Sequence, residues 1–452
     1  IPISKTMHKF SLTQFLIFVL LFTTVLFTKS RSGLLAFGIS SVVFWGIYFI
    51  RLGHLEIRSI RNFVAINLLL LLFTIAFPNP VRDLVLKSAP APAPAGPALE
   101  VGGTESGTIR KIVWTGAIRI WQASAKNFLL GTGPETFAEA YYQFRPIEHN
   151  QTSEWELLYN KAHNEFLNQL STTGILGLLS YLVLLSFMAY SMLKTQSSTL
   201  KTALFAGWLT IPVTNFWGFS VIVPQLLLFL LPAIAIAVSD PLPHTPQKPS
   251  HPGVVPTLLV LGAIGYIFFS ISKYLLADIS YAAGQSATHY FNSTQNTQYL
   301  LSAYDQLTHA FSLNRSEPAI ASEYAVSAAY LASALHTTDA TSAATLAQLS
   351  TAVSQRALAI SPRHPNYYKS RARAMILLSD IDPQYLTLAA QSLQQAALIS
   401  PTDPRIPYNL GIIYKYLNDI PSSTPYFQQS LQLKPDFSDP QAQLNQLKTL
   451  SP

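Results

Sequence analysis

Seven apolar segments, each long enough or nearly long enough to cross a lipid bilayer, constrain this chain more than any other feature. They cover residues 11–28, 33–50, 63–77, 173–193, 202–219, 221–238 and 254–272. A transmembrane helix needs about 20 apolar residues to cross the hydrocarbon core. Only 11% of the 452 residues are charged, against about 25% in ordinary soluble domains. We therefore expect an all-α, polytopic bundle, in which Pro212, Pro224 and Pro232 kink segments 202–219 and 221–238 or make them re-entrant.

The positive charges predict how this bundle is oriented. If the seven segments alternate in direction, one side receives Lys5, Lys9, Arg51, Arg58, Arg61, Lys194, Lys201 and Lys248. Short loops rich in lysine and arginine face the cytoplasm. A polar loop at about residues 79–172 and everything after residue 272 are then extracytoplasmic. Because the first residue is Ile1, we expect the chain to lack earlier spans at its N-terminus.

Composition excludes several classes of site. The chain has no cysteine, which excludes disulfides and thiolate metal sites. The net charge of +7 includes no polybasic tail, so nucleic acid is not an expected partner. No spacing of His, Asp or Glu in the loop matches a metal-ligand motif. We expect neither a metal nor a cofactor.

An internal repeat marks the C-terminal region. Pro401 and Pro435 lie 34 residues apart, which is the tetratricopeptide period. The residues between them fit that repeat at Leu410, Gly411, Tyr414 and Phe427. The sequence predicts a transmembrane domain at 1–272 and a tetratricopeptide-like α-solenoid at 273–452. The solenoid is either a stabilising scaffold, which we favour, or a groove for an envelope protein or a glycan.

The polar loop carries most of the candidate chemistry and begins with an amphipathic helix at 109–127. One stripe is apolar, and the other contains Lys111, Thr115, Arg119, Gln122 and Lys126, with Arg110 beside it. Such a surface can hold a diphosphate, with arginine as a bidentate donor. The alternative is an interfacial helix attracted to anionic lipid head groups, and the residue spacing alone favours this alternative.

A histidine near the end of the loop is the candidate general base. His163 precedes Phe166, Leu167 and Leu170 at helical spacing, so it is either a packing residue or a base able to accept a hydroxyl proton near neutral pH. Asn164 can orient it or bind substrate. His149 is the rival, and we rank it lower because His163 adjoins a membrane span.

Two further features bear on the substrate. The turn from Gly131 to Glu135 lacks the Lys-Ser/Thr of a nucleotide-binding loop, so ATP is not implied. Arg31 lies in a short outer loop between apolar segments, where a charge is costly unless it is paired. A lipid diphosphate is one partner for it, and snorkelling to the head groups is the alternative.

Together these pieces resemble the O-antigen ligase/polymerase superfamily of bacterial envelope glycosyltransferases over about residues 11–238. The family's Ser-Arg motif corresponds to Ser30-Arg31. Its loop pattern, R-x-x-x-W, G-x-G-P-x-x-F, H-N-x-x-L and G-x-x-G, corresponds to Arg110, Trp114, Gly131, Gly133, Pro134, Phe137, His163, Asn164, Leu167, Gly174 and Gly177.

The resemblance implies a metal-independent, multi-pass glycosyltransferase of the bacterial cytoplasmic (inner) membrane. His163 would activate the acceptor, while Arg31 and Arg110 would hold the diphosphate of an undecaprenyl-linked glycan. Lys111, Arg119 and Asn164 are further substrate-binding candidates. The acceptor is a lipid-core sugar, another repeat unit or a protein hydroxyl, as in an O-oligosaccharyltransferase. The alternative is a non-enzymatic envelope assembly or transport factor that recruits partners through its repeats.

Overall fold

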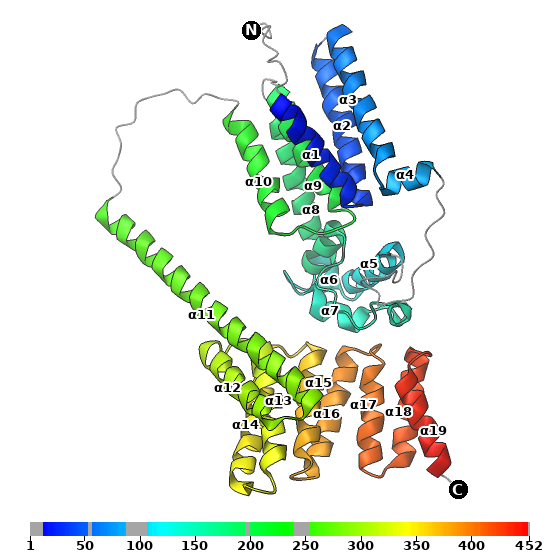
Figure 1. Ribbon diagram of the computed structural model, residues 1–452, viewed down its shortest axis with the longest axis vertical. Helices are drawn as coiled ribbons and strands as arrows, with labels where there is room; N and C mark the ends of the chain where they lie inside the picture. The colour runs from blue at the N-terminus through cyan, green and yellow to red at the C-terminus, as the bar shows by residue number, and fades with distance from the viewer. Residues whose placement is uncertain (1–11, 53–56, 87–105, 195–198, 239–252, 451–452) are drawn as a thin grey trace. The chain divides into compact units, whose positions relative to one another are not determined.

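The computed structural model describes residues 12–52, 57–86, 106–194, 199–238 and 253–450, and its regular elements there are all helices (Figure 1). Apolar helices occupy all seven predicted positions: α1 (Leu12–Phe27), α2 (Arg31–Leu52), α3 (Ile57–Ala76), α8 (Glu165–Lys194), α9 (Thr199–Thr214), α10 (Ile222–Ala237) and α11 (Val254–Thr294). Four of them, α2, α3, α8 and α11, are long and apolar enough to span a membrane. The prediction of an all-α membrane protein is confirmed at this level.

The other apolar helices are shorter than a full span. Helices α9 and α10 have 16 residues each and contain Pro212 and Pro232, respectively. Proline removes a helical hydrogen bond, so it weakens both helices where the sequence predicted kinks. The predicted orientation rests partly on Lys5, Lys9 and Lys248, which lie outside the described residues. It therefore stays a prediction.

The chain packs as two compact units. One combines Ile1–Phe137 with Tyr159–Thr245, and the other combines Ala138–Leu158 with Pro246–Pro452. Helix α11 therefore packs with the C-terminal helices, and so does a short segment from the middle of the polar loop. We call residues 138–158 the inserted segment. The predicted boundary between a transmembrane domain at 1–272 and a repeat domain at 273–452 stays a prediction.

The first unit has its core between α8, α9 and α10. Leu185, Phe205, Trp208, Ile211 and Leu228 are buried there, and the Trp208 indole N–H donates to the Leu228 carbonyl at 3.0 Å. Most other apolar side chains of these helices are exposed, as expected for lipid-facing surfaces. At one end, the Arg51 guanidinium donates to the Thr202 hydroxyl at 2.9 Å.

The second unit is a row of helix pairs (Figure 1). After α11 come α12 (Thr297–Leu313), α13 (Pro318–Leu335), α14 (Ala340–Ile360), α15 (Pro365–Leu378), α16 (Gln384–Ile399), α17 (Arg405–Tyr416), α18 (Ile420–Leu433) and α19 (Ser438–Leu450). Small residues set their spacing: Ala329, Ala372, Ala389 and Ala396 are fully or almost fully buried. Small side chains let paired helices approach closely.

The pair α17 and α18 shows how the predicted repeat positions work. The Phe427 ring fills the space beside Gly411, where an added Cβ would lie 2.6 Å from the ring. Ser423 and Ser430 take the small-residue positions, and their buried hydroxyls donate to the Gly411 and Pro404 carbonyls, both at 2.7 Å. Both polar side chains are therefore satisfied inside the core.

We predict that Phe427→Ala destabilises this pair by about 3–5 kcal/mol, the usual cost of truncating a buried phenylalanine. The measurement is hydrogen exchange of the α17 and α18 amides in the full-length protein. Tyr416→Ala is the matched control, because Tyr416 is an aromatic residue of the same pair with 66% of its surface exposed. Equal protection in both variants would contradict the assigned packing.

Candidate functional site

Two glycines let the polar loop cross the first turns of α8. Gly131 ends α6 (Ala125–Leu130) with φ 69° and ψ −166°, and Gly174 lies within α8 with φ 69° and ψ −172°. This backbone region is open essentially to glycine alone. The Gly174 conformation also breaks the regular path of α8 just before its apolar stretch.

The crossing is made by backbone against backbone. A Cβ on Gly131 would lie 2.2 Å from the Thr172 carbonyl carbon, and a Cβ on Gly174 would lie 2.3 Å from the Leu129 carbonyl carbon. The Gly133 N–H also donates to the Thr172 carbonyl at 2.8 Å. No larger residue fits at either glycine without displacing the backbone segment that it contacts.

His163 lies in the tight turn that leads into α8. Its φ is 54°, a conformation that non-glycine residues seldom adopt. The imidazole is half-buried, with its ring centre 5.2 Å from the rings of both Tyr159 and Phe219. The strained backbone and two flanking rings restrict the directions in which the imidazole can point.

The two residues after His163 hold this turn in place. The buried Asn164 side chain accepts a hydrogen bond from the Leu167 N–H at 3.0 Å, which caps the start of α8. The Glu165 N–H donates to the Asn215 carbonyl at 2.8 Å, and the Glu165 carboxylate accepts from the Ser220 N–H at 3.2 Å. Asn164 thus supports the backbone that carries His163, and its predicted contact with substrate stays a prediction.

The connection between α9 and α10 also reaches this turn. Besides Asn215 and Ser220, it contributes Phe219 against the imidazole and Phe216 against Phe166. Sequence reasoning missed these residues because they lie within a continuous apolar run. The one available signal was the polar and glycine-containing cluster Asn215–Ser220, which interrupts that run.

Helix α5 (Ser106–Gln122) brings a second part of the predicted motif to His163. The Trp114 indole N–H donates to the His163 carbonyl at 3.4 Å, and its ring packs edge-on against Phe216 at 5.9 Å. Arg110 lies one helical turn before Trp114 on the same side of α5 and is half-buried. The structure therefore joins Trp114 directly to the His163 turn and places Arg110 on that side of the helix.

The two stripes predicted for this helix are present. Val113, Ala117 and Ile120 are buried, whereas Lys111 and Arg119 are exposed. Because successive residues turn by about 100°, Arg119 lies about 180° around α5 from Arg110. The predicted length was wrong: Ser124 accepts from the Asn127 N–H and starts α6, so Lys126 belongs to a second helix.

Arg31 is the first residue of α2 and is exposed. The Ser30 hydroxyl accepts the Gly33 N–H at 3.1 Å and so caps this helix. The predicted Ser-Arg motif is therefore a helix N-terminus, where the helix dipole favours an anionic ligand. The predicted convergence of Arg31 on His163 stays a prediction.

The rival histidine, His149, has a different environment, because it belongs to the inserted segment. It is 1% exposed, and its Nδ1 pairs with the Tyr141 hydroxyl at 2.8 Å. Burial, together with the nearby Arg145 guanidinium, lowers the pKa of His149 to about 4. The structure thus shows His149 buried and hydrogen-bonded, and its lower rank behind His163 stays a prediction.

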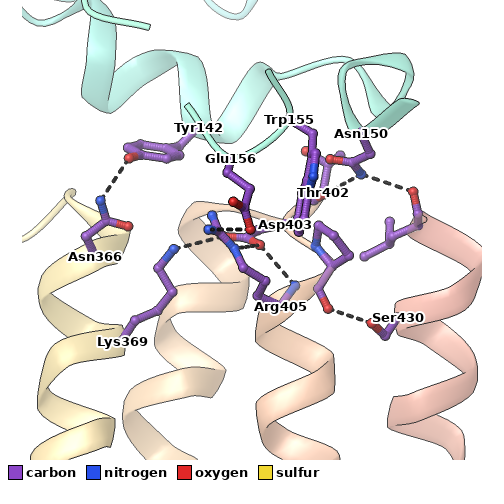
Figure 2. Close-up of polar contacts among 12 residues, drawn as sticks. Tyr142, Asn150, Trp155, Glu156, Asn366, Lys369, Thr402, Asp403, Arg405 and Ser430 are labelled. Carbon is purple, nitrogen blue, oxygen red and sulfur yellow. Dashed lines mark hydrogen bonds and ion pairs between the residues drawn. The ribbon is translucent and has the colours of Figure 1, made fainter. Parts of the chain in front are cut away.

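The inserted segment is held by the ends of the C-terminal helix pairs (Figure 2). The Asn150 amide donates to the carbonyls of Thr402 and Leu433 at 2.8 and 3.1 Å. The backbone carbonyl of Asn150 accepts from the Lys434 ammonium at 2.9 Å. Trp155 lies over that ammonium, 4.9 Å from the ring centre. The Leu433 carbonyl is at the C-terminal end of α18, where a helix leaves such groups without a helical partner.

A buried carboxylate lies beneath this contact. Asp403 is 1% exposed and accepts from the Lys369 ammonium at 2.9 Å and from the Arg405 Nε at 3.1 Å (Figure 2). Burial alone would raise the pKa of Asp403, but Lys369 and Arg405 hold that pKa far below its usual range. The carboxylate is therefore ionised at any pH near neutrality and fixes two cations at the ends of neighbouring helices.

Neither unit gathers metal ligands among its described residues: no group of three His, Asp or Glu side chains is positioned to hold an ion. The groups that the structure brings together at the His163 turn are its imidazole, the rings of Tyr159 and Phe219, and the Trp114 indole.

Comparison with known proteins supports the resemblance seen in the motifs. Residues 16–182 match the family model described as O-antigen ligase. The matched stretch contains Arg31, α5, the glycine crossing and His163. The match supports the O-antigen ligase superfamily and, with it, a ligase-type membrane glycosyltransferase. A search of the curated proteins found no match.

We predict that Gly174→Ala lowers the thermal stability of the solubilised protein. The backbone conformation alone costs about 1–3 kcal/mol for a non-glycine residue, and the Cβ also displaces Leu129. Gly207→Ala is the control, since a Cβ at Gly207 meets nothing within 4 Å. Similar melting temperatures for the two variants would show that the crossing tolerates a side chain.

We also predict that acid loosens the inserted segment. His149 has a lower pKa when packed than its ordinary 6.5, so packing is fully favoured above about pH 6.5 and weakens as pH falls toward 4. Hydrogen exchange of amides 138–158, corrected for intrinsic rates, measures this.

The variant His149→Gln should show a shallower pH dependence. Some dependence should remain, because burial and Lys369 also lower the pKa of His364 in the same unit. An unchanged slope in His149→Gln would rule out this histidine as its source.

Proposed function

We propose that the chain transfers a glycan from an undecaprenyl-diphosphate carrier to an acceptor hydroxyl outside the bacterial cytoplasmic membrane. The observation that carries this proposal is the hydrogen bond from Trp114 to the His163 carbonyl. It joins the helix bearing Arg110 to the turn bearing the candidate base. The O-antigen ligase match over residues 16–182 supports the same class of reaction.

In the proposed reaction His163 is the general base. Its imidazole takes the proton of the acceptor hydroxyl as the hydroxyl oxygen forms a bond to the anomeric carbon. The bond from that carbon to the carrier diphosphate breaks, and the diphosphate leaves with the electron pair. Attack opposite the leaving group inverts the anomeric centre. Tyr159 and Phe219 flank the imidazole and limit its orientation.

Arg110 and Arg31 are proposed to stabilise the leaving diphosphate. An arginine offers two parallel N–H donors to phosphate oxygens, and Arg31 adds the N-terminus of α2. Arg119 lies on the opposite side of α5 from Arg110, so we assign Arg119 and Lys111 to the lipid head-group region around the donor. Asn164 acts by holding the turn that carries His163.

We propose the lipid-core sugar or another repeat unit as the acceptor, which makes the protein an O-antigen ligase or polymerase. A protein O-oligosaccharyltransferase is the variant of the same reaction with a Ser or Thr acceptor. The C-terminal helix pairs are proposed to be the tetratricopeptide-like, extracytoplasmic scaffold. Their contacts with the inserted segment favour a scaffold over a recruiting surface.

We predict that His163→Ala and Arg110→Ala each reduce glycan transfer by about 10²- to 10⁴-fold, the usual range for a general base and for a charge-stabilising donor. Arg119→Ala should reduce it far less. The assay follows transfer from a purified lipid-linked glycan, resolved on gels, with the protein in nanodiscs.

The exposed residues His289 and Arg363 supply the controls His289→Ala and Arg363→Ala. If His163→Ala and Arg110→Ala keep normal transfer at normal expression, the protein is not this transferase. A non-enzymatic assembly factor, which depends on its C-terminal helices, then becomes the better account.

A further inference from the structure

An exposed apolar surface lies beside the glycine crossing, on the short helix α6. Phe128, Leu129 and Leu130 are 43%, 46% and 61% exposed. They are consecutive residues on a segment that the crossing fixes rigidly. In an aqueous loop, three adjacent exposed apolar side chains are unfavourable, so this surface calls for a partner. We define Phe128–Leu130 as the apolar ridge.

The fold fixes the height of this ridge along α8. The peptide between Leu129 and Leu130 lies directly against Gly174, since a Cβ there would be 2.3 Å from the Leu129 carbonyl carbon and 2.5 Å from the Leu130 nitrogen. From Gly174 to Lys194 the apolar part of α8 covers about 30 Å at 1.5 Å per residue. That is the thickness of the hydrocarbon core. Gly174, and the ridge with it, therefore lie at the edge of the hydrocarbon.

Exposed apolar side chains of α8 also begin at the height of the ridge. Leu176 and Leu179, within two turns after Gly174, are 54% and 50% exposed. These side chains belong to a predicted span and need lipid around them. The ridge lies at the start of this apolar stretch along α8, so it is at the boundary of the same lipid.

The residues around the ridge have the chemistry of a membrane interface. The Trp121 ring stacks on Phe128 at 4.8 Å, and its indole N–H donates to the Phe128 carbonyl at 3.1 Å. Tryptophan is enriched at head-group depth because its ring is apolar and its N–H is polar. Lys126 is exposed on the same short helix, where its ammonium can reach lipid phosphates.

We propose that the apolar ridge inserts into the outer edge of the lipid bilayer and anchors the start of the polar loop to the membrane surface. Its partner is the bilayer itself, with acyl chains around Phe128, Leu129 and Leu130 and head groups around Trp121 and Lys126. The anchor holds the C-terminal end of α5 at the depth where a lipid-linked substrate presents its head group. The proposal requires that α8 spans the membrane and does not require transferase activity.

The test uses the absence of cysteine in this sequence, which makes every introduced cysteine unique. Leu130→Cys is spin-labelled, and the full-length protein is reconstituted into phosphatidylglycerol-containing nanodiscs. The relaxation of the spin label is compared in the presence of oxygen, which concentrates in lipid, and in the presence of a water-soluble nickel complex. Leu176→Cys supplies the lipid reference, and Gln151→Cys, at an exposed position of the inserted segment, supplies the water reference.

We expect the label at residue 130 to behave like the lipid reference, with an oxygen-to-nickel accessibility ratio several-fold above that of residue 151. A ratio equal to the water reference would overturn the proposal. Low accessibility to both reagents would also overturn it, because protein and not lipid would then cover the ridge. Phe128→Cys repeats the test if the first variant does not fold. Loss of transferase activity in any variant does not bear on the result.

Discussion

The backbone crossing of Gly131 and Gly174 is the constraint on which the candidate site depends. It ties the end of α6 to the early part of α8, a candidate membrane span, with no side chain between them. Because the contact is between backbones, its geometry has little freedom to adjust. The chain from residue 132 to residue 173 therefore begins and ends at fixed positions. The turn that carries His163 lies near the end of this segment, just before α8. Helix α5 is then close enough for Trp114 to meet this turn.

Much of the architecture follows from local sequence. Long apolar runs gave helices at all seven expected places, because a chain in lipid must satisfy its backbone internally. The alternation of buried Val113 and Ala117 with exposed Lys111 and Arg119 followed the 3.6-residue period. The small positions of the C-terminal repeat were also recognisable. Such features depend on neighbours a few residues away, and these are visible in the sequence.

Other features depended on contacts between distant residues. The α9–α10 connection carries Phe219 to His163 across more than 50 residues. The break at Asn215–Ser220 marks this connection in the sequence but does not identify the residue that Phe219 meets. The inserted segment pairs Asn150 with Leu433, which is 283 residues away. Ser124 caps α6 and so separates it from α5, which is a local signal. The amphipathic pattern continues across both helices, and for this reason the sequence predicted a single helix. A sequence pattern gives the face of a helix and does not identify the surface that the face will meet.

Helix α11 has a mechanical consequence. It runs without interruption from Val254 to Thr294, about 60 Å at 1.5 Å per residue. Its first part is apolar and exposed, and its last part packs Ala277, Gly284 and Ala287 into the helix pairs. After Pro256 it contains no proline, and it is one unbroken helix between the two parts. A tilt of the apolar end of α11 would therefore be passed along the helix to the attached helix pairs.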